Sequence, residues 1–310
     1  DGRVRASCAI ELATLAFQIA ANLALTLVMP DYRALIAGLY VSSIVRPILT
    51  LLVLRGGSRL AWDGALGREF FGFSRWIVAS TLVTLLITQS DKILFARLFS
   101  VADFGVYMLP ANLALALIPF GRNYVERYFF PLVSRSWREG AVALSAVFYT
   151  VRQRFYLLLF AGFGFGIGIA PALFRILFDH RYEYGWIYFS VLLLRGAFDL
   201  DSYTNIQTAL AMGRTSPTLR ANLVRLILFA LWVAALFRPL GPIALPLALA
   251  AAELGALLYS IALLRRAGLF RFRAHLLYYG ALAVACVVGA AISLAFAPHV
   301  VSAGFALLWT

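Results

Sequence analysis

Residues 72–135 read GFSRWIVASTLVTLLITQSDKILFARLFSVADFGVYMLPANLALALIPFGRNYVERYFFPLVSR. Two long apolar segments are joined there by a short polar turn at residues 100–103. Charged side chains interrupt these segments at Asp91, Lys92, Arg122, Glu126 and Arg127. A charge at membrane depth is costly, so such groups usually mark a transport pathway or a paired partner. The stretch therefore predicts membrane-spanning helices that carry functional residues.

The composition of the whole chain also indicates a membrane protein. Its 310 residues are 63% hydrophobic and 13% charged, with a mean hydropathy of +0.87. The formal net charge of +13 comes mostly from arginines in short loops, a pattern that favours membrane topology over nucleic-acid binding. The chain begins without Met and ends in an apolar run, so we expect a fragment of a longer protein.

Apolar runs recur along the chain and are long enough to cross a hydrocarbon core of about 30 Å. They predict an all-α polytopic membrane helix bundle with about ten transmembrane helices. The expected spans are residues 8–29, 33–54, 74–98, 104–134, 155–177, 186–211, 221–237, 243–264, 274–296 and a tenth from Val300.

Arginine-rich loops alternate with loops that hold few arginines. The rich loops carry Arg3 and Arg5; Arg55, Arg59 and Arg68; Arg135, Arg138, Arg152 and Arg154; Arg214 and Arg220; and Arg265, Arg266, Arg271 and Arg273. Short loops rich in arginine stay in the cytoplasm, so we expect the first residues of the chain to be cytoplasmic.

Arginines inside the spans are the first candidates for substrate binding. Arg46 lies near the centre of its span, where an anionic substrate or a water-filled cavity would satisfy it. A salt bridge or snorkelling to the interface would do so equally well. Arg195 and Asp199 are four residues apart and can pair on one helical face. The polar run continues through Asp201, Tyr203, Asn205 and Gln207, as in a helix that lines a hydrated cavity.

Four further charged residues suggest binding or ion coupling. Arg122 and Glu126 repeat the four-residue spacing within 104–134. Glu253 is the only acid in 243–264, and burial there favours the protonated carboxyl. It is our preferred candidate for proton coupling, with a neutral structural glutamate as the alternative. Asp91 is a second candidate for ion coupling.

Several patterns argue against enzymatic chemistry. The run GFGFGIG at 162–168 lacks a P-loop lysine, and its two overlapping GxxxG pairs indicate close helix packing. No HExxH motif occurs, Ser, His and Asp do not cluster, and the two cysteines are Cys8 and Cys286. We interpret His180, His275 and His299 as interfacial residues. We therefore expect no enzyme, no cofactor and no metal site.

Residues in the opening stretch carry a resemblance to a known family. They are Asp91-Lys92-Ile93-Leu94, the turn Arg97-Leu98-Phe99-Ser100 up to Phe104-Gly105-Val106-Tyr107, and Phe130-Pro131-Leu132-Val133-Ser134-Arg135. This pattern resembles the seventh and eighth helices of the oligosaccharide-lipid flippases. These are polysaccharide biosynthesis proteins of the multidrug/oligosaccharidyl-lipid/polysaccharide exporter superfamily. Phe95 departs from the pattern, which commonly has glycine there.

The resemblance implies that the chain is helices five to fourteen of a two-lobed, 14-helix flippase. Residues 1–54 would then be the last two helices of the N-terminal lobe, and 55–73 a basic cytoplasmic linker. Residues 74–264 would be the six-helix C-terminal lobe, and 265–310 an additional helix pair whose last helix is truncated.

The resemblance also implies a function. The protein would move undecaprenyl-pyrophosphate-linked oligosaccharide across the bacterial inner membrane by alternating access, for O-antigen, lipopolysaccharide or exopolysaccharide synthesis. Its partners would be membrane lipids, a polysaccharide polymerase and glycosyltransferases. The expected substrate contacts are Arg46, Arg122, Arg195 and Tyr203, with Asp199 orienting Arg195. A cation-coupled multidrug antiporter and a membrane-embedded transferase for lipid-linked sugars are the alternatives.

Overall fold

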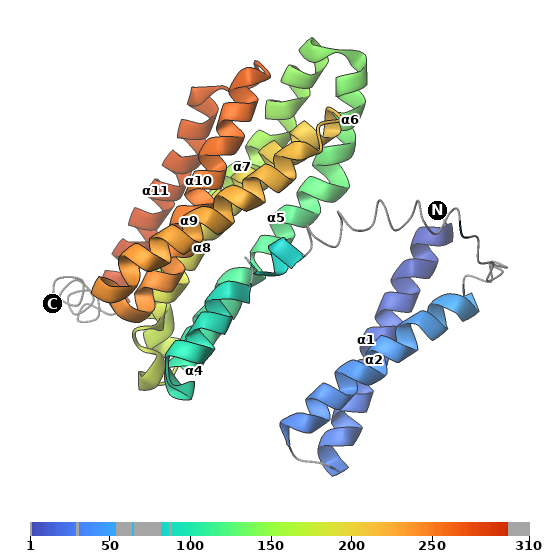
Figure 1. Ribbon diagram of the computed structural model, residues 1–310, viewed down its shortest axis with the longest axis vertical. Helices are drawn as coiled ribbons and strands as arrows, with labels where there is room; N and C mark the ends of the chain where they lie inside the picture. Colours follow the sequence, from blue (N-terminus) through green and yellow to red (C-terminus); the bar gives the residue numbers. More distant parts are fainter. Residues whose placement is uncertain (1, 29–30, 54–63, 65–81, 87–88, 297–310) are drawn as a thin grey trace. The chain divides into compact units, whose positions relative to one another are not determined.

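The structure, a computed structural model, describes residues 2–28, 31–53, 64, 82–86 and 89–296. All regular secondary structure in these ranges is helical, which confirms the all-α class. The chain divides into two compact units, Asp1–Phe71 and Gly72–Thr310 (Figure 1). Each unit is described by itself below.

The first unit contains two helices that pack along each other, α1 (Gly2–Val28) and α2 (Tyr32–Val53). Gly38 of α2 faces Asn22 of α1, and a Cβ at Gly38 would lie 1.6 Å from the Asn22 amide oxygen. A larger residue at this position would therefore displace the Asn22 side chain.

The second unit begins with helical residues at 82–86 and 89–98 and continues into a nearly unbroken rod. The rod consists of α4 (Val101–Ala116), α5 (Ile118–Tyr124), a π turn (Val125–Phe129) and α6 (Phe130–Glu139). Ser100 caps α4, because its hydroxyl accepts a hydrogen bond from the Asp103 amide at 3.2 Å. Gly140, at φ 122°, ends the rod in a conformation that favours glycine.

The largest interface of the second unit joins α7 (Ala141–Leu177) to α11 (Phe272–Phe296). A Cβ at Gly164 would lie 2.0 Å from the Leu282 carbonyl oxygen, and one at Gly168 would lie 2.1 Å from that of Cys286. Gly289 makes the reciprocal approach to α7. Backbones this close require glycine, so the packing interpretation of GFGFGIG is confirmed at these positions.

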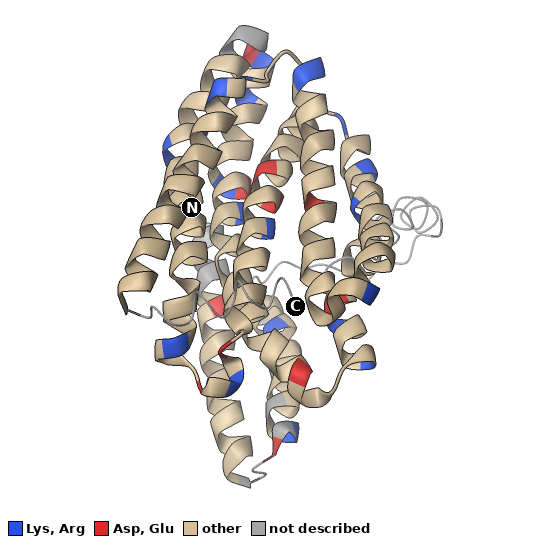
Figure 2. Cartoon of the chain, turned by 90° about the vertical axis from the view of Figure 1, so that its left-hand side faces the viewer, with Lys and Arg blue, Asp and Glu red and all other residues tan. Residues whose placement is uncertain are grey.

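Helix α8 (Gly185–Ala211) is the buried centre of the second unit and contacts α4, α7 and α10 (Figure 1). A short 3₁₀ turn, His180–Tyr182, precedes it. Helices α9 (Ser216–Leu240) and α10 (Ala244–Arg266) follow and are linked by a second 3₁₀ turn, Gly241–Ile243. Charged residues gather mainly toward helix ends, although several acids and bases lie at mid-length within the bundle (Figure 2).

The expectation of ten spans is not met among the described residues. Five stretches there are long and apolar enough to cross a membrane: Ala9–Leu27, Val101–Glu139, Leu144–Leu177, Ser216–Arg266 and Phe272–Ala295. Two of the expected spans, 221–237 and 243–264, fall within the single stretch Ser216–Arg266. Buried acids and an arginine lower the hydropathy of α8, and α2 contributes only the shorter apolar stretch Ile36–Leu51. Residues 74–81 and 87–88 of the expected span 74–98, and the run from Val300, lie outside the described residues.

Candidate functional site

The polar face of α8 receives an arginine from the rod. Asp199 accepts from Arg122 Nε at 3.2 Å and from Nη2 at 2.7 and 2.9 Å. The two helices come close because Gly121 packs on Leu200, where an added Cβ would lie 2.6 Å from Leu200 Cδ1. The Asp199 side chain is 7% exposed and that of Arg122 is 43% exposed. One partner of this pair is thus sealed while the other stays accessible.

Tyr203, one helical turn further along α8, completes this accessible group. The Arg122 guanidinium carbon lies 4.8 Å from the centre of the Tyr203 ring. The Tyr203 hydroxyl donates to Glu126 Oε1 at 2.5 Å, and Glu126 is itself exposed. A cation over an aromatic ring, with further hydroxyl and carboxylate groups, can bind an anion and neighbouring sugar hydroxyls.

A second ion pair lies beside the first. Arg225 of α9 donates to Glu253 of α10 through Nε, at 2.9 Å to each oxygen, and through Nη2 at 2.7 Å. It also donates to Asn222 Oδ1 at 2.9 Å and to Ser202 Oγ of α8 at 3.0 Å. Glu253 is therefore an ion-paired carboxylate rather than the isolated acid that its own span suggested. Any proton that it accepts must displace Arg225.

The structure does not form the expected pair between Arg195 and Asp199. Asp199 bonds to Arg122 instead, and Arg195 Nε is buried with no partner among the described residues. Arg122 is the partner of Asp199, although it is distant in sequence. Its Nε and Nη2 both bond to the one carboxylate, and such two-nitrogen pairs are the strong ones. Asp91 accepts a hydrogen bond from Tyr107, and its Oδ1 is buried without a described partner.

Arg46 belongs to the first unit. Its Nη2 lies 3.6 Å from Glu11 Oε1 of α1, and the two side chains are 64% and 66% exposed. An ion pair this exposed contributes little to stability. Glu11 of α1 is thus a partner for the salt bridge that was raised as an alternative for Arg46.

Two interpretations from the sequence are wrong. Arg152 was assigned to a cytoplasmic loop, but it lies within α7 with a side chain that is 0% exposed and pairs with Asp201. His275 was assigned to the interface, but it is buried and its Nδ1 lies 3.2 Å from Asp201 Oδ2. The Arg152 error arose because the apolar run was expected to begin at residue 155, whereas the helix begins at Ala141.

Residues 3–183 match the family model described as polysaccharide biosynthesis protein. The chain belongs to this polysaccharide biosynthesis family. It is a flippase-like family of the multidrug/oligosaccharidyl-lipid/polysaccharide exporter superfamily, and the resemblance drawn from the opening stretch is thereby confirmed. No curated protein and no solved structure matches the chain. The matched region of this polysaccharide biosynthesis protein includes Arg46, Asp91 and Arg122, whereas α8 to α11 lie beyond it.

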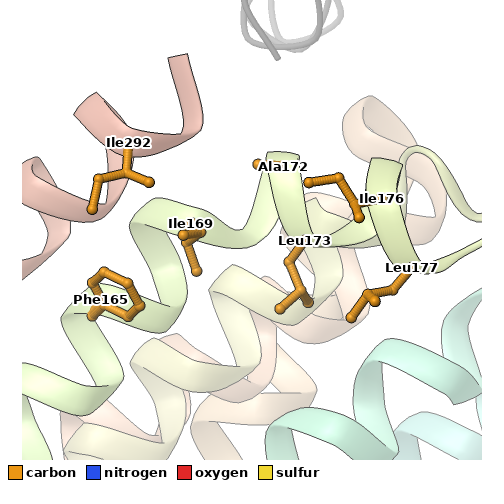
Figure 3. A pocket seen from close by; sticks show the side chains of 7 residues that line it. All are labelled: Phe165, Ile169, Ala172, Leu173, Ile176, Leu177 and Ile292. Carbon is orange, nitrogen blue, oxygen red and sulfur yellow. The ribbon is translucent and has the colours of Figure 1, made fainter. Parts of the chain in front are cut away.

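An apolar groove lies on α7 away from these charges (Figure 3). It has a volume of about 320 Å³ and is lined by Phe165, Ile169, Ala172, Leu173, Ile176, Leu177 and Ile292. Its lining offers no group that could bind a phosphate or a sugar. In this family member the polar face of α8, rather than the groove, is the candidate functional site.

Proposed function

We propose that the protein is a flippase that moves undecaprenyl-pyrophosphate-linked oligosaccharide across the bacterial inner membrane by alternating access. The observation that carries the proposal is the Arg122–Asp199 pair. Arg122 is held through its own Nε and Nη2, and its side chain is still 43% exposed. It lies within the expected span 104–134. Family membership supports the glycan class, because the family's description is polysaccharide biosynthesis.

The chemistry of the pair suits a diphosphate. A guanidinium presents a planar fork that matches two phosphate oxygens. Arg122 uses Nε and Nη2 on Asp199, and Nη1 has no acceptor among the described residues. A diphosphate could bind Nη1 first and then compete with Asp199 for the remaining donors. Tyr203 and Glu126 would meet the sugars, while the prenyl chain stayed in the bilayer.

Competition for Arg122 also supplies a means of alternating access. A ligand shifts a conformational equilibrium only through its different affinities for the two states. A diphosphate that takes Arg122 from Asp199 would weaken the contact between α5 and α8. The charges of Arg225 and Arg195, which also act on Asp199, would stabilise the released carboxylate. Substrate binding would thus favour a state in which the rod and α8 separate.

The finer topology belongs to the same proposal. We place residues 1–54 in an N-terminal lobe, 74–264 in a C-terminal lobe and 265–310 in an additional helix pair, joined by a cytoplasmic linker at 55–73. The first residues would be cytoplasmic. The alternation of arginine-rich loops supports this orientation even without Arg152, because Arg135 and Arg138 remain next to the break at Gly140.

A cation-coupled drug antiporter is the nearest rival. Such a transporter needs a carboxylate that a cationic drug can reach, whereas Asp199 and Glu253 are each bound by an arginine. A transferase acting on lipid-linked sugars would form product in detergent, without a membrane to cross.

The test is surface polysaccharide in bacteria that lack their own flippase and express the complete protein. Arg122→Ala should abolish the polymer while the protein inserts at the normal level, because the diphosphate contact is lost. The matched control is Arg135→Ala on the same rod, where the arginine is 76% exposed and bonds to Glu139 at 3.1 Å. Normal polymer output with Arg122→Ala would refute the proposal. Polymer lost equally in both variants would also count against it.

A further inference from the structure

A second carboxylate of α8, Asp201, is the centre of a sealed polar cluster. Its Oδ1 accepts from Arg152 Nη2 and from Asn205 Nδ2, the latter at 3.2 Å. Its Oδ2 faces His275 Nδ1 and the Tyr279 hydroxyl, each at 3.2 Å. The side chains of Arg152 and Asp201 are both 0% exposed, and that of His275 is 7% exposed. Four helices, α7, α8, α10 and α11, meet around this cluster.

The charges of the cluster balance only when His275 is neutral. One guanidinium and one carboxylate already neutralise each other, so a protonated imidazole would add an uncompensated charge inside the bundle. Arg152 lies 4.2 Å from the Tyr156 ring and 5.5 Å from the Tyr278 ring, a setting with little water to screen a new charge. The other groups around the cluster are Tyr149 and Tyr156 from α7, Ser260 from α10, and Tyr278 and Tyr279 from α11. Arg265 and Arg271 are exposed and lie over the rings of Phe270 and Tyr149.

His275 has one nitrogen that this conformation leaves unused. Nδ1 bonds to Asp201, and Nε2 is buried with no hydrogen-bond partner among the described residues. A neutral imidazole with its proton on Nδ1 presents only a lone pair at Nε2. A protonated imidazole presents an N–H there, and a buried donor without an acceptor is unfavourable. A donor at Nε2 would thus find an acceptor only in a conformation where Nε2 meets water.

The start of α11 lies between two points that are held against α7. Its later turns are fixed to α7. The backbone atoms of Leu282 and Cys286 lie so close to Gly164 and Gly168 that no larger residue would fit at these two positions. The turn before α11 is also fixed, since the Tyr149 hydroxyl donates to the Leu269 carbonyl and accepts from the Arg271 amide, both at 2.7 Å. Opening is thus confined to the turns that carry His275 and Tyr279.

We propose that His275, Asp201 and Arg152 form a proton-binding site, and that proton uptake by His275 releases the first turns of α11 from α8. The site would supply the coupling ion of the transporter, a role that rests on the proposed function. The release itself needs no substrate. Imidazole changes charge between about pH 5 and pH 8, the range in which a transmembrane proton gradient acts.

The test is hydrogen exchange of the full chain in detergent at about pH 7.5 and pH 5.5, corrected for the intrinsic pH dependence of exchange. Peptides from residues 272–279 should exchange about threefold or more faster at the lower pH, as local opening predicts. Peptides from 282–292 should not change and serve as an internal control. His275→Asn, which keeps a donor near the Nδ1 position, should abolish the pH effect. His180→Asn, at an imidazole that is 93% exposed, should retain it.

Each outcome decides the proposal. A wild-type chain with no pH effect at 272–279 would overturn it, and this measurement does not depend on how the variants fold. A pH effect that persists in His275→Asn would overturn it as well. Because no glycan is present, a positive result stands even if transport assays refute the flippase, and a negative result leaves the role of Arg122 untouched.

Discussion

Two carboxylates of α8, Asp199 and Asp201, are only two residues apart and have opposite settings. Successive residues in a helix are rotated by about 100°, so these two side chains point to different sides of α8. Asp199 meets an arginine that is 43% exposed, while Asp201 meets one that is 0% exposed. The same chemical pair, aspartate with arginine, thus occurs once at an accessible surface and once in a sealed interior.

The two pairs differ in the exposure of the arginine, and this difference suggests that one pair serves binding and the other serves stability. A partly exposed arginine can exchange its partner for an incoming anion at moderate cost. A fully buried arginine cannot leave its carboxylate without exposing an unpaired charge to the protein interior. This difference agrees with the substrate contact proposed for Arg122 and with a structural charge at Arg152.

Breaking the sealed pair should have the largest effect on stability. Arg152→Met leaves Asp201 buried without its main partner and should lower the unfolding free energy by about 3–5 kcal/mol. Reversible unfolding in mild detergent measures the loss. Arg154→Met, two residues away at an exposed position of α7, is the control and should change stability by less than about 0.5 kcal/mol. Equal losses in the two variants would show that burial does not distinguish these arginines.

Glu253→Gln should have an intermediate effect. Arg225 keeps Asn222 and Ser202 but loses its charged partner, so we expect a loss of about 1–3 kcal/mol. Glu139→Gln, at an exposed acid near the end of α6, is the control. If Glu253 carries the coupling proton, the variant should also lose the dependence of transport on the proton gradient. Full transport by the variant at every proton gradient would assign coupling elsewhere, with His275 as the next candidate.

Asp199→Asn should change stability least, by about 1 kcal/mol or less, because Arg122 can be hydrated when its carboxylate is lost. Its effect should appear in transport instead, since nothing would then return Arg122 after the glycan leaves. Measuring both polysaccharide output and the unfolding free energy of this variant tests the expected loss of transport and the expected small loss of stability. Asp179→Asn, at a loop carboxylate that is 76% exposed, is the control. A stability loss as large as that of Arg152→Met would erase the distinction between the two pairs.

Much of the helical fold follows from the sequence, because long apolar runs have few alternatives in a membrane. The rod at Val101–Glu139 and the helix at Phe272–Phe296 agree closely with the expected spans 104–134 and 274–296. Errors arose where the ends of an apolar run and the ends of the helix do not coincide. Helix α7 starts well before its apolar run, so Arg152 was counted with the loops.

The members of the candidate site could be found in the sequence, but their partners could not. Arg122, Asp199 and Glu253 stood out as charges within apolar runs. Spacing along one helix predicts only local pairs, and it joined Asp199 to Arg195. The observed partners come from other helices, Arg122 from α5 and Arg225 from α9. Only the packing of α8 against its neighbours decides such long-range pairs.

The glycine contacts between α7 and α11 constrain how this protein is made. Helices α8, α9 and α10 are synthesised between the two, so α7 enters the membrane long before its closest neighbour exists. Until α11 arrives, Gly164 and Gly168 face lipid or a temporary partner, and Arg152 lacks the enclosure that Tyr278 later provides. A ribosome that stops before residue 272 would leave a bundle with an open seam, which quality-control proteases could recognise.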